Sequence, residues 1–182
     1  MAKVHPLPPG LPNVSSRRES FTIWMKSLVM QANGCTVYNE NGEIVYRIDN
    51  YDKKGSSEVY LMDLRGKVLY TILRRVWFLG RWEGYEGDSS SLRKEKPKFK
   101  VTRKGVVDAE AGCYRLEGLA GKSEFKIIDC RRGGVVAEAK RKQSSSGVVL
   151  GDDVLSLVVE PHIDHSLIMA LVTVYGLIHQ RL

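Results

Sequence analysis

Two histidines and a carboxylate lie close together in the segment EPHIDHSL and are candidates for a metal site. His162 and His165 are three residues apart, on either side of Asp164. Imidazole nitrogens and carboxylate oxygens bind zinc, but a site needs three or four protein ligands, and a third is not apparent here. The alternative is that a strand ends at Pro161 and that Asp164 caps the first amides of a helix. We therefore expect no metal and no cofactor.

Other candidates for chemistry are weaker. The segment NENGE around Gly42 resembles a calcium loop only faintly, because it lacks the regular acidic spacing and the twelfth-position glutamate. We interpret Asn41-Gly42 as a type I′ hairpin turn instead. Three cysteines are widely spaced without a C-x-x-C motif, which is typical of reduced thiols in a cytosolic protein: Cys35, Cys113 and Cys130. No nucleophile-elbow or phosphate-loop motif is present, so we expect a non-enzymatic protein without catalytic residues.

The basic residues are more informative, since the net charge of +7 favours an acidic partner. The segment LRKEKPKFKVTRKG holds seven cations against one acid. If a strand begins at Pro97, Lys98 and Lys100 share its outer face while Phe99 and Val101 face the core. The predicted anionic-lipid site consists of the following cations: Lys98, Lys100, Arg103, Lys104, Arg74 and Arg75.

Three explanations of these cations stay open. Lysines commonly protect exposed strands from aggregation, so the charges could simply be solvated. Clustered Lys and Arg also bind anionic lipid surfaces, and the tryptophans in VWFLGRWEGYEG suit a membrane interface as well as a barrel wall. Nucleic acid is the third explanation, although no recognition helix or aromatic RNA-binding motif accompanies the charge.

The composition and pattern predict the elements that position these residues. With 182 residues, 43% of them hydrophobic, the chain is expected to form one domain at 20–182 after a flexible, proline-rich arm at 1–19. Between residues 20 and 160 short alternating segments such as EIVYRID follow one another, separated by turn signals. A weak repeat, NENGEIVY, DLRGKVLY and DCRRGGVV, places an Asx residue before a glycine and a strand. About a dozen antiparallel strands are expected, and a closed barrel would remove their edges.

The end of the chain has a different pattern. Residues Ser166 to Ile178 carry no charge, and apolar side chains surround the helical wheel. These 13 residues would make a helix of roughly 20 Å, too short for a membrane core of about 30 Å. We therefore predict a hydrophobic helix that fills the barrel.

These segments resemble the plant LURP-one-related proteins. GCTVYNENGEIVYRIDNY and EVYLMDLRGKVLYTI are similar to the start of that family, and GDDVLSLVVEPHIDHSLIMALVTVYGLI is similar to its end. The resemblance extends from about Phe21 onward. It implies a mainly β, tubby-like closed barrel of about twelve antiparallel strands around a central C-terminal helix, related to tubby proteins and phospholipid scramblases.

The resemblance also implies classes of function. Tubby domains bind phosphoinositides and can act as membrane-tethered transcription factors, whereas scramblases move lipids between leaflets. The founding LURP-one-related member is linked to plant defence. We expect a non-enzymatic module that binds phosphoinositide or another anionic lipid, with a lipid-translocating protein or a DNA-associated regulator as the alternatives. A cytoplasmic monomer is expected, peripheral at the plasma membrane or present in the nucleus, without a transmembrane segment.

Overall fold

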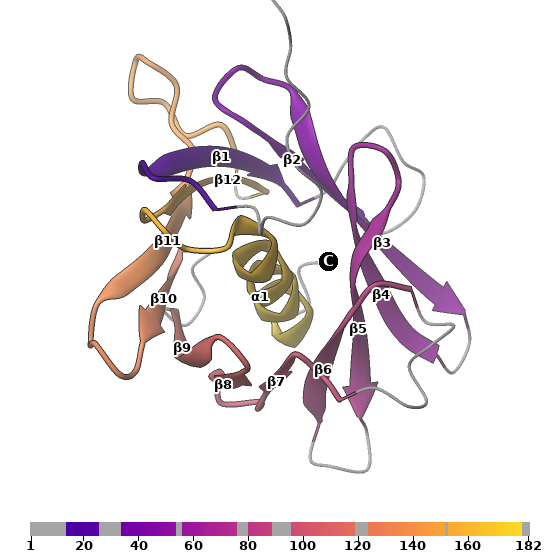
Figure 1. Ribbon diagram of the computed structural model, residues 1–182. Helices are drawn as coiled ribbons and strands as arrows, with labels where there is room; N and C mark the ends of the chain where they lie inside the picture. Colours follow the sequence, from indigo (N-terminus) through magenta and orange to yellow (C-terminus); the bar gives the residue numbers. More distant parts are fainter. Residues whose placement is uncertain are drawn as a thin grey trace, which may run out of the picture.

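The computed structural model describes residues 14–25, 34–53, 56–75, 80–88, 96–118, 124–151 and 153–179. Most of the predicted N-terminal arm, residues 1–13, lies outside this set. Twelve antiparallel strands form a closed barrel around one helix, which confirms the predicted fold class (Figure 1). The elements are β1 (Glu19–Trp24), β2 (Gly34–Tyr38), β3 (Ile44–Lys53), β4 (Ser56–Asp63), β5 (Val68–Arg75), β6 (Arg81–Glu86), β7 (Phe99–Val101), β8 (Val106–Ala109), β9 (Gly112–Gly118), β10 (Phe125–Asp129), β11 (Val135–Arg141), β12 (Val154–Val159) and α1 (His165–Ile178).

Each strand pairs with its neighbours in the sequence, and β1 pairs with β12 to close the barrel. Because successive strands reverse direction, their connections alternate between the two ends of the barrel. The described turns β2–β3, β4–β5, β8–β9 and β10–β11 lie at the end where α1 begins, which we call the N-cap end. Among the described turns, β7–β8 and β11–β12 lie at the opposite end, the C-cap end, toward which α1 runs.

The helix fills the barrel as the sequence predicts. Twelve consecutive residues, His165 to Gly176, are buried, so every side of the helix contacts the inner face of the sheet. The packing leaves no room for a side chain at Gly118, where a Cβ would lie 1.9 Å from the Tyr175 hydroxyl oxygen. Within the described residues, no helix combines the length and apolar character needed to cross a membrane.

The start of α1 confirms the predicted cap. The Asp164 carboxylate accepts a hydrogen bond from the Ser166 backbone amide at 2.9 Å. This bond satisfies one of the amides that a helix leaves without an intrahelical partner. Asp164 therefore acts as a capping residue.

The internal repeat corresponds to three turns at the N-cap end. Their Asx side chains, Asn39, Asp63 and Asp129, each accept the backbone amide two residues later, at 3.0, 2.9 and 2.8 Å. An Asx side chain that binds its own following backbone favours a turn. Each copy of the repeat therefore forms a turn that reverses the direction of the chain.

The predicted type I′ turn at Asn41-Gly42 is wrong. That turn needs positive φ at both central residues, but Gly42 has φ 78° and, among described non-glycine residues, only His162 has positive φ. The Gly42 amide instead donates to the Asn39 carbonyl at 3.1 Å, and the strand register shifts between Val37 and Tyr38. This is a longer turn with a glycine bulge, which the Asn39 side chain stabilises.

Candidate functional site

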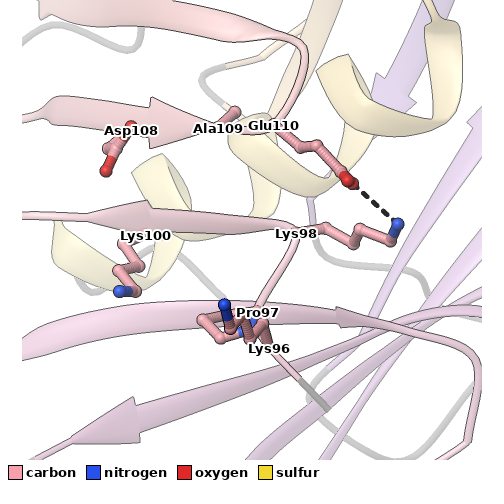
Figure 2. Close-up of a pocket in the computed structure, with 7 residues that line it drawn as sticks. All are labelled: Lys96, Pro97, Lys98, Lys100, Asp108, Ala109 and Glu110. Carbon is pink, nitrogen blue, oxygen red and sulfur yellow. Dashed lines mark hydrogen bonds and ion pairs between the residues drawn. The ribbon is translucent and has the colours of Figure 1, made fainter.

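The β7–β8 hairpin carries the core of the predicted basic site. Phe99 and Val101 are fully buried in the barrel, and Lys98 and Lys100 alternate with them on the outer face. The alternation predicted from the sequence is confirmed. Lys98 and Lys100 line an open depression with Lys96, Pro97, Asp108, Ala109 and Glu110 (Figure 2).

Lys98 is held by two carboxylates. Its Nζ lies 2.7 Å from Glu110 Oε2 and 3.7 Å from Glu86 Oε2 (Figure 2 draws the Glu110 contact). The hydrogen bond to Glu110, and then the charges of both carboxylates, raise the pKa of Lys98. The charge of Lys98 is therefore largely compensated within the protein, which weakens its attraction for an external anion.

Lys100 has a different environment. It stands across from Glu83 of β6 and Asp108 of β8 in the strand register. Within the part of the chain that the structure describes, it makes no ion pair. Two carboxylates therefore lie near Lys100 without neutralising it directly.

Arg103 and Lys104 project from the tight β7–β8 turn at the C-cap end. The Gly105 amide donates to the Thr102 carbonyl at 2.9 Å, and the Val106 amide donates to Thr102 Oγ1 at 3.1 Å. Gly105 has φ 79°, and a Cβ there would lie 2.7 Å from the Leu116 carbonyl oxygen, so the turn requires glycine. Both cations are exposed, and among described residues neither has an ion-pair partner.

The two arginines at the end of β5 have separate roles. Arg75 Nε lies 2.9 Å from Glu83 Oε2, and another nitrogen of its guanidinium donates to the Tyr85 hydroxyl at 3.0 Å. Burial disfavours the charge of Glu83, but hydrogen bonds from Arg75, Tyr85 and Arg81 outweigh it and lower the pKa of this carboxyl. The Arg74 guanidinium carbon lies 5.8 Å from the centroid of the Trp82 ring, within cation–π range. Arg75 is thus part of a wall-stabilising network, whereas Arg74 is exposed over an aromatic ring.

The aromatic residues of the segment VWFLGRWEGYEG lie only partly within the described residues. Trp82 is buried in the barrel core, and Tyr85 is buried in the Arg75–Glu83 network. Trp77 and Phe78 lie outside the described residues. For Trp82, the barrel-wall interpretation is therefore correct.

An exposed apolar segment lies on the β11–β12 connection, and the sequence analysis did not identify it. Val148, Val149 and Leu150 are 63%, 40% and 53% exposed. The connection projects beyond the barrel as a small hairpin, light orange in Figure 1, and the Ser144 amide donates to the Val148 carbonyl at 2.8 Å. The sequence signal was three adjacent apolar residues between SSSG and GDD, without the alternation of a half-buried strand.

The apolar segment and the basic turn share one end of the barrel. The connections β7–β8 and β11–β12 both lie at the C-cap end, separated around the rim by strands β9 and β10. Val106, which follows the basic turn, is also exposed, at 44%. The C-cap end therefore combines unpaired cations with exposed apolar side chains.

The two histidines considered for a metal site differ in environment. His162 is exposed with φ 63°, while His165 is buried and packs edge-on against Phe21, with ring centroids 5.2 Å apart. Burial lowers the pKa of His165, against the opposing charges of Glu19 and Asp164. Among described residues, no group of three His, Cys, Asp or Glu side chains could hold a metal ion.

Comparison with known proteins places the whole barrel in one family. A sequence model described as LURP-one-related matches residues 19–176. Protein LURP-one-related 4 of Arabidopsis thaliana is 46% identical over 98% of this chain and 87% of its own length. Protein LURP-one-related 11 of the same plant is 39% identical over 92% of this chain and 81% of its own length.

A solved structure supports the same fold. The X-ray structure of a protein from Arabidopsis thaliana superposes with a TM-score of 0.70, covering 92% of this chain and 94% of that chain at 18% identity. At this identity the likeness concerns the fold alone. The match to the family model and the identity with the Arabidopsis relatives show that this chain belongs to the LURP-one-related family.

Proposed function

We propose that this protein is a non-enzymatic barrel that binds anionic membrane surfaces, with its C-cap end facing the bilayer. One observation carries the proposal: unpaired Arg103 and Lys104 lie at the same end as the exposed apolar residues Val148 and Leu150. A bilayer surface presents anionic headgroups above hydrocarbon, so it complements both features together. No other partner in the predicted classes does so.

The expected energies support this combination. Each Lys or Arg near an anionic leaflet contributes about 1 kcal/mol, and full burial of a valine or leucine side chain contributes about 1.5–3 kcal/mol. Membrane attachment commonly needs two such signals, because one alone gives only weak and reversible binding. A basic turn with an apolar hairpin supplies both.

The six cations predicted from the sequence contribute unequally in this proposal. Arg103 and Lys104 are the main contacts, and Lys100 and Arg74 extend the positive surface along β7 and β5. Lys98 and Arg75 are held by carboxylates at 2.7 and 2.9 Å, so we assign them to stabilising the wall. A phosphoinositide headgroup is the preferred ligand class, because several phosphate charges can meet neighbouring cations at once.

The alternatives receive less support from the described surface. DNA would meet the same cations, but the described helix is enclosed in the barrel and is not available as a recognition helix. Lipid translocation would need a path through the bilayer, and the apolar side chains of α1 pack against the sheet instead. We propose a location at the cytosolic face of a membrane; a regulatory role in plant defence stays a prediction.

Co-sedimentation with liposomes tests the proposal. The Arg103→Gln/Lys104→Gln variant should bind phosphoinositide-containing vesicles roughly tenfold less tightly, or worse, if each cation contributes about 1 kcal/mol. Lys98→Gln is the control, because this lysine is half-buried and already paired with Glu110. The affinity of this variant should stay close to that of the parent. Neutral phosphatidylcholine vesicles should show little difference among the three proteins.

A second variant separates the apolar contribution from the electrostatic one. Val148→Ser/Leu150→Ser should weaken binding at both low and high salt, whereas the deficit of the charge variant should shrink as salt screens exposed charges. Absence of vesicle binding by the parent protein would reject the membrane proposal. Loss of binding in Lys98→Gln with normal binding in Arg103→Gln/Lys104→Gln would move the site away from the C-cap end.

A further inference from the structure

Two cysteines that are far apart in the sequence face each other across neighbouring strands. Strands β9 and β10 pair with Tyr114 opposite Asp129, so the next position in the register places Cys113 opposite Cys130. The Cys130 amide donates to the Cys113 carbonyl at 2.9 Å, which extends the ladder by that one step. Side chains opposite each other in an antiparallel pair project from the same face.

Both thiols lie on the outside of the barrel. On strand β9, Tyr114 and Leu116 are buried and face inward. Cys113 therefore points outward by alternation, and it is partly exposed. Cys130 is exposed to solvent. A hydrogen bond with the Cys130 thiol raises the pKa of Cys113, and the nearby Asp108 adds to this effect while Arg131 opposes it. The two sulfur groups are therefore close enough to interact.

The backbone geometry suits a disulfide. Residues opposite each other in an antiparallel ladder have Cα atoms about 4.5–5.5 Å apart, and disulfides span Cα separations of about 4.4–6.8 Å. Closure would then need side-chain rotation without a change of fold. The third cysteine, Cys35, is only 3% exposed, and burial raises the pKa of its thiol, so it is not available for the same reaction.

We propose that Cys113 and Cys130 form an oxidation site, a dithiol that closes to an intramolecular disulfide under mild oxidation by a peroxide. Cys130 is more exposed, so its sulfur attacks the peroxide first; the O–O bond breaks and a sulfenic acid and one water form. The Cys113 sulfur then attacks the Cys130 sulfur, the S–O bond breaks, and a second water leaves with the thiol proton. In sum, two thiols and one hydrogen peroxide give one disulfide and two waters.

The product would link β9 to the β10–β11 turn at the N-cap end. That turn carries the exposed residues Arg131 and Arg132. The disulfide would fix the turn against the barrel and leave the C-cap end unchanged. The site is thus independent of the proposed membrane surface.

The test is oxidation of the purified full-length protein, at low concentration, with hydrogen peroxide, followed by denaturation, alkylation and mass spectrometry. The expected product is a monomer that carries a single alkyl group, at Cys35, and that yields a peptide joining Cys113 to Cys130. A thiol reductant should restore three alkylated cysteines. Cys35→Ser is the matched control and should form the same disulfide.

Single substitutions check the order of events. Cys113→Ser should accumulate sulfenic acid at Cys130, detectable with a dione probe, because the resolving thiol is absent. Cys130→Ser should resist the same peroxide exposure. Sulfinic acid at Cys130 with Cys113 still free, dimers linked through Cys130, or three unchanged thiols in the parent would each overturn the proposal.

Discussion

The β4–β5 turn at the N-cap end and the β7–β8 turn at the C-cap end use the same hydrogen bond but carry different charge. At the N-cap end, Asp63 accepts the backbone amide of Lys67, four residues later, at 2.9 Å. At the C-cap end, Thr102 accepts the amide of Val106, also four residues later, at 3.1 Å. A carboxylate accepts the backbone amide in the β4–β5 turn, and a neutral hydroxyl accepts it in the β7–β8 turn.

Two further turns differ in their acceptor in the same way, whereas the β2–β3 turn at the N-cap end uses the neutral amide of Asn39. Asp129 accepts the Arg131 amide at 2.8 Å at the N-cap end, and Ser144 accepts the Val148 amide at 3.2 Å at the C-cap end. A carboxylate within a turn reduces the positive potential of the cations beside it, and a hydroxyl does not. The choice of acceptor can therefore change the charge of one turn without changing the fold.

The largest effect is expected from breaking what both ends share, the central helix. Leu171 is fully buried, so Leu171→Asp would place an unpaired charge inside the barrel. Its cost, on the order of several kcal/mol, is comparable with the total stability of a domain, about 5–15 kcal/mol. We expect insoluble or unfolded protein, measured by size exclusion and circular dichroism. Leu64→Asp, at a position that is 66% exposed, is the control and should fold normally. A cooperative melt of Leu171→Asp like that of the parent would show that the helix does not form the core of the barrel.

A smaller loss of stability is expected at the wall network of the C-cap end. Glu83→Gln removes the charged partner of Arg75 and Arg81, and loss of hydrogen bonds to a charged group costs about 1.5–3 kcal/mol. The pKa of Glu83 is lowered in the fold, so its contribution is present above the unfolded value of about 4.5 and is lost as pH falls through the folded value. Urea unfolding should show a gap between parent and variant at pH 7 that closes in acid. A gap that stays constant down to the acid transition would show that Glu83 acts by packing.

The smallest expected effect tests the comparison of the turns directly. Thr102→Asp should keep the turn, because Asp can accept the same amide, but it places a carboxylate beside Arg103 and Lys104. We expect several-fold weaker binding to phosphoinositide vesicles with little change in the melting temperature. Thr102→Asn is the matched control, since it offers an uncharged acceptor of similar size and should bind like the parent. Equal binding by both variants would show that the turn acceptor does not govern the surface charge.

Periodicity predicts much of this molecule because period-two alternation is a local property. It placed Phe99 and Val101 inside and Lys98 and Lys100 outside, and the uncharged segment ending at Ile178 is a buried helix, as expected. These features depend on neighbouring residues in the chain. They require no knowledge of strand register.

Features that depend on register could not be predicted in the same way. Glu110 and Glu86 reach Lys98 only because β6, β7 and β8 pair as they do, so the sequence showed a cation without showing its partners. Cys113 and Cys130 meet through the pairing of β9 with β10, although their spacing matches no local motif. The apolar hairpin was missed for another reason, since exposure of adjacent apolar residues is decided by what the barrel leaves uncovered.

The central claim is that the C-cap end, and not the N-cap end, faces an anionic bilayer. Val148 and Leu64 allow a matched test, because they are 63% and 66% exposed at opposite ends. A polarity-sensitive fluorophore would be attached at Val148→Cys or Leu64→Cys, in a protein carrying Cys113→Ser and Cys130→Ser, with Cys35 buried. On phosphoinositide-containing vesicles the label at 148 should shift to the blue while the label at 64 stays unchanged. A shift at 64, or bound protein in which neither label shifts, would contradict the account.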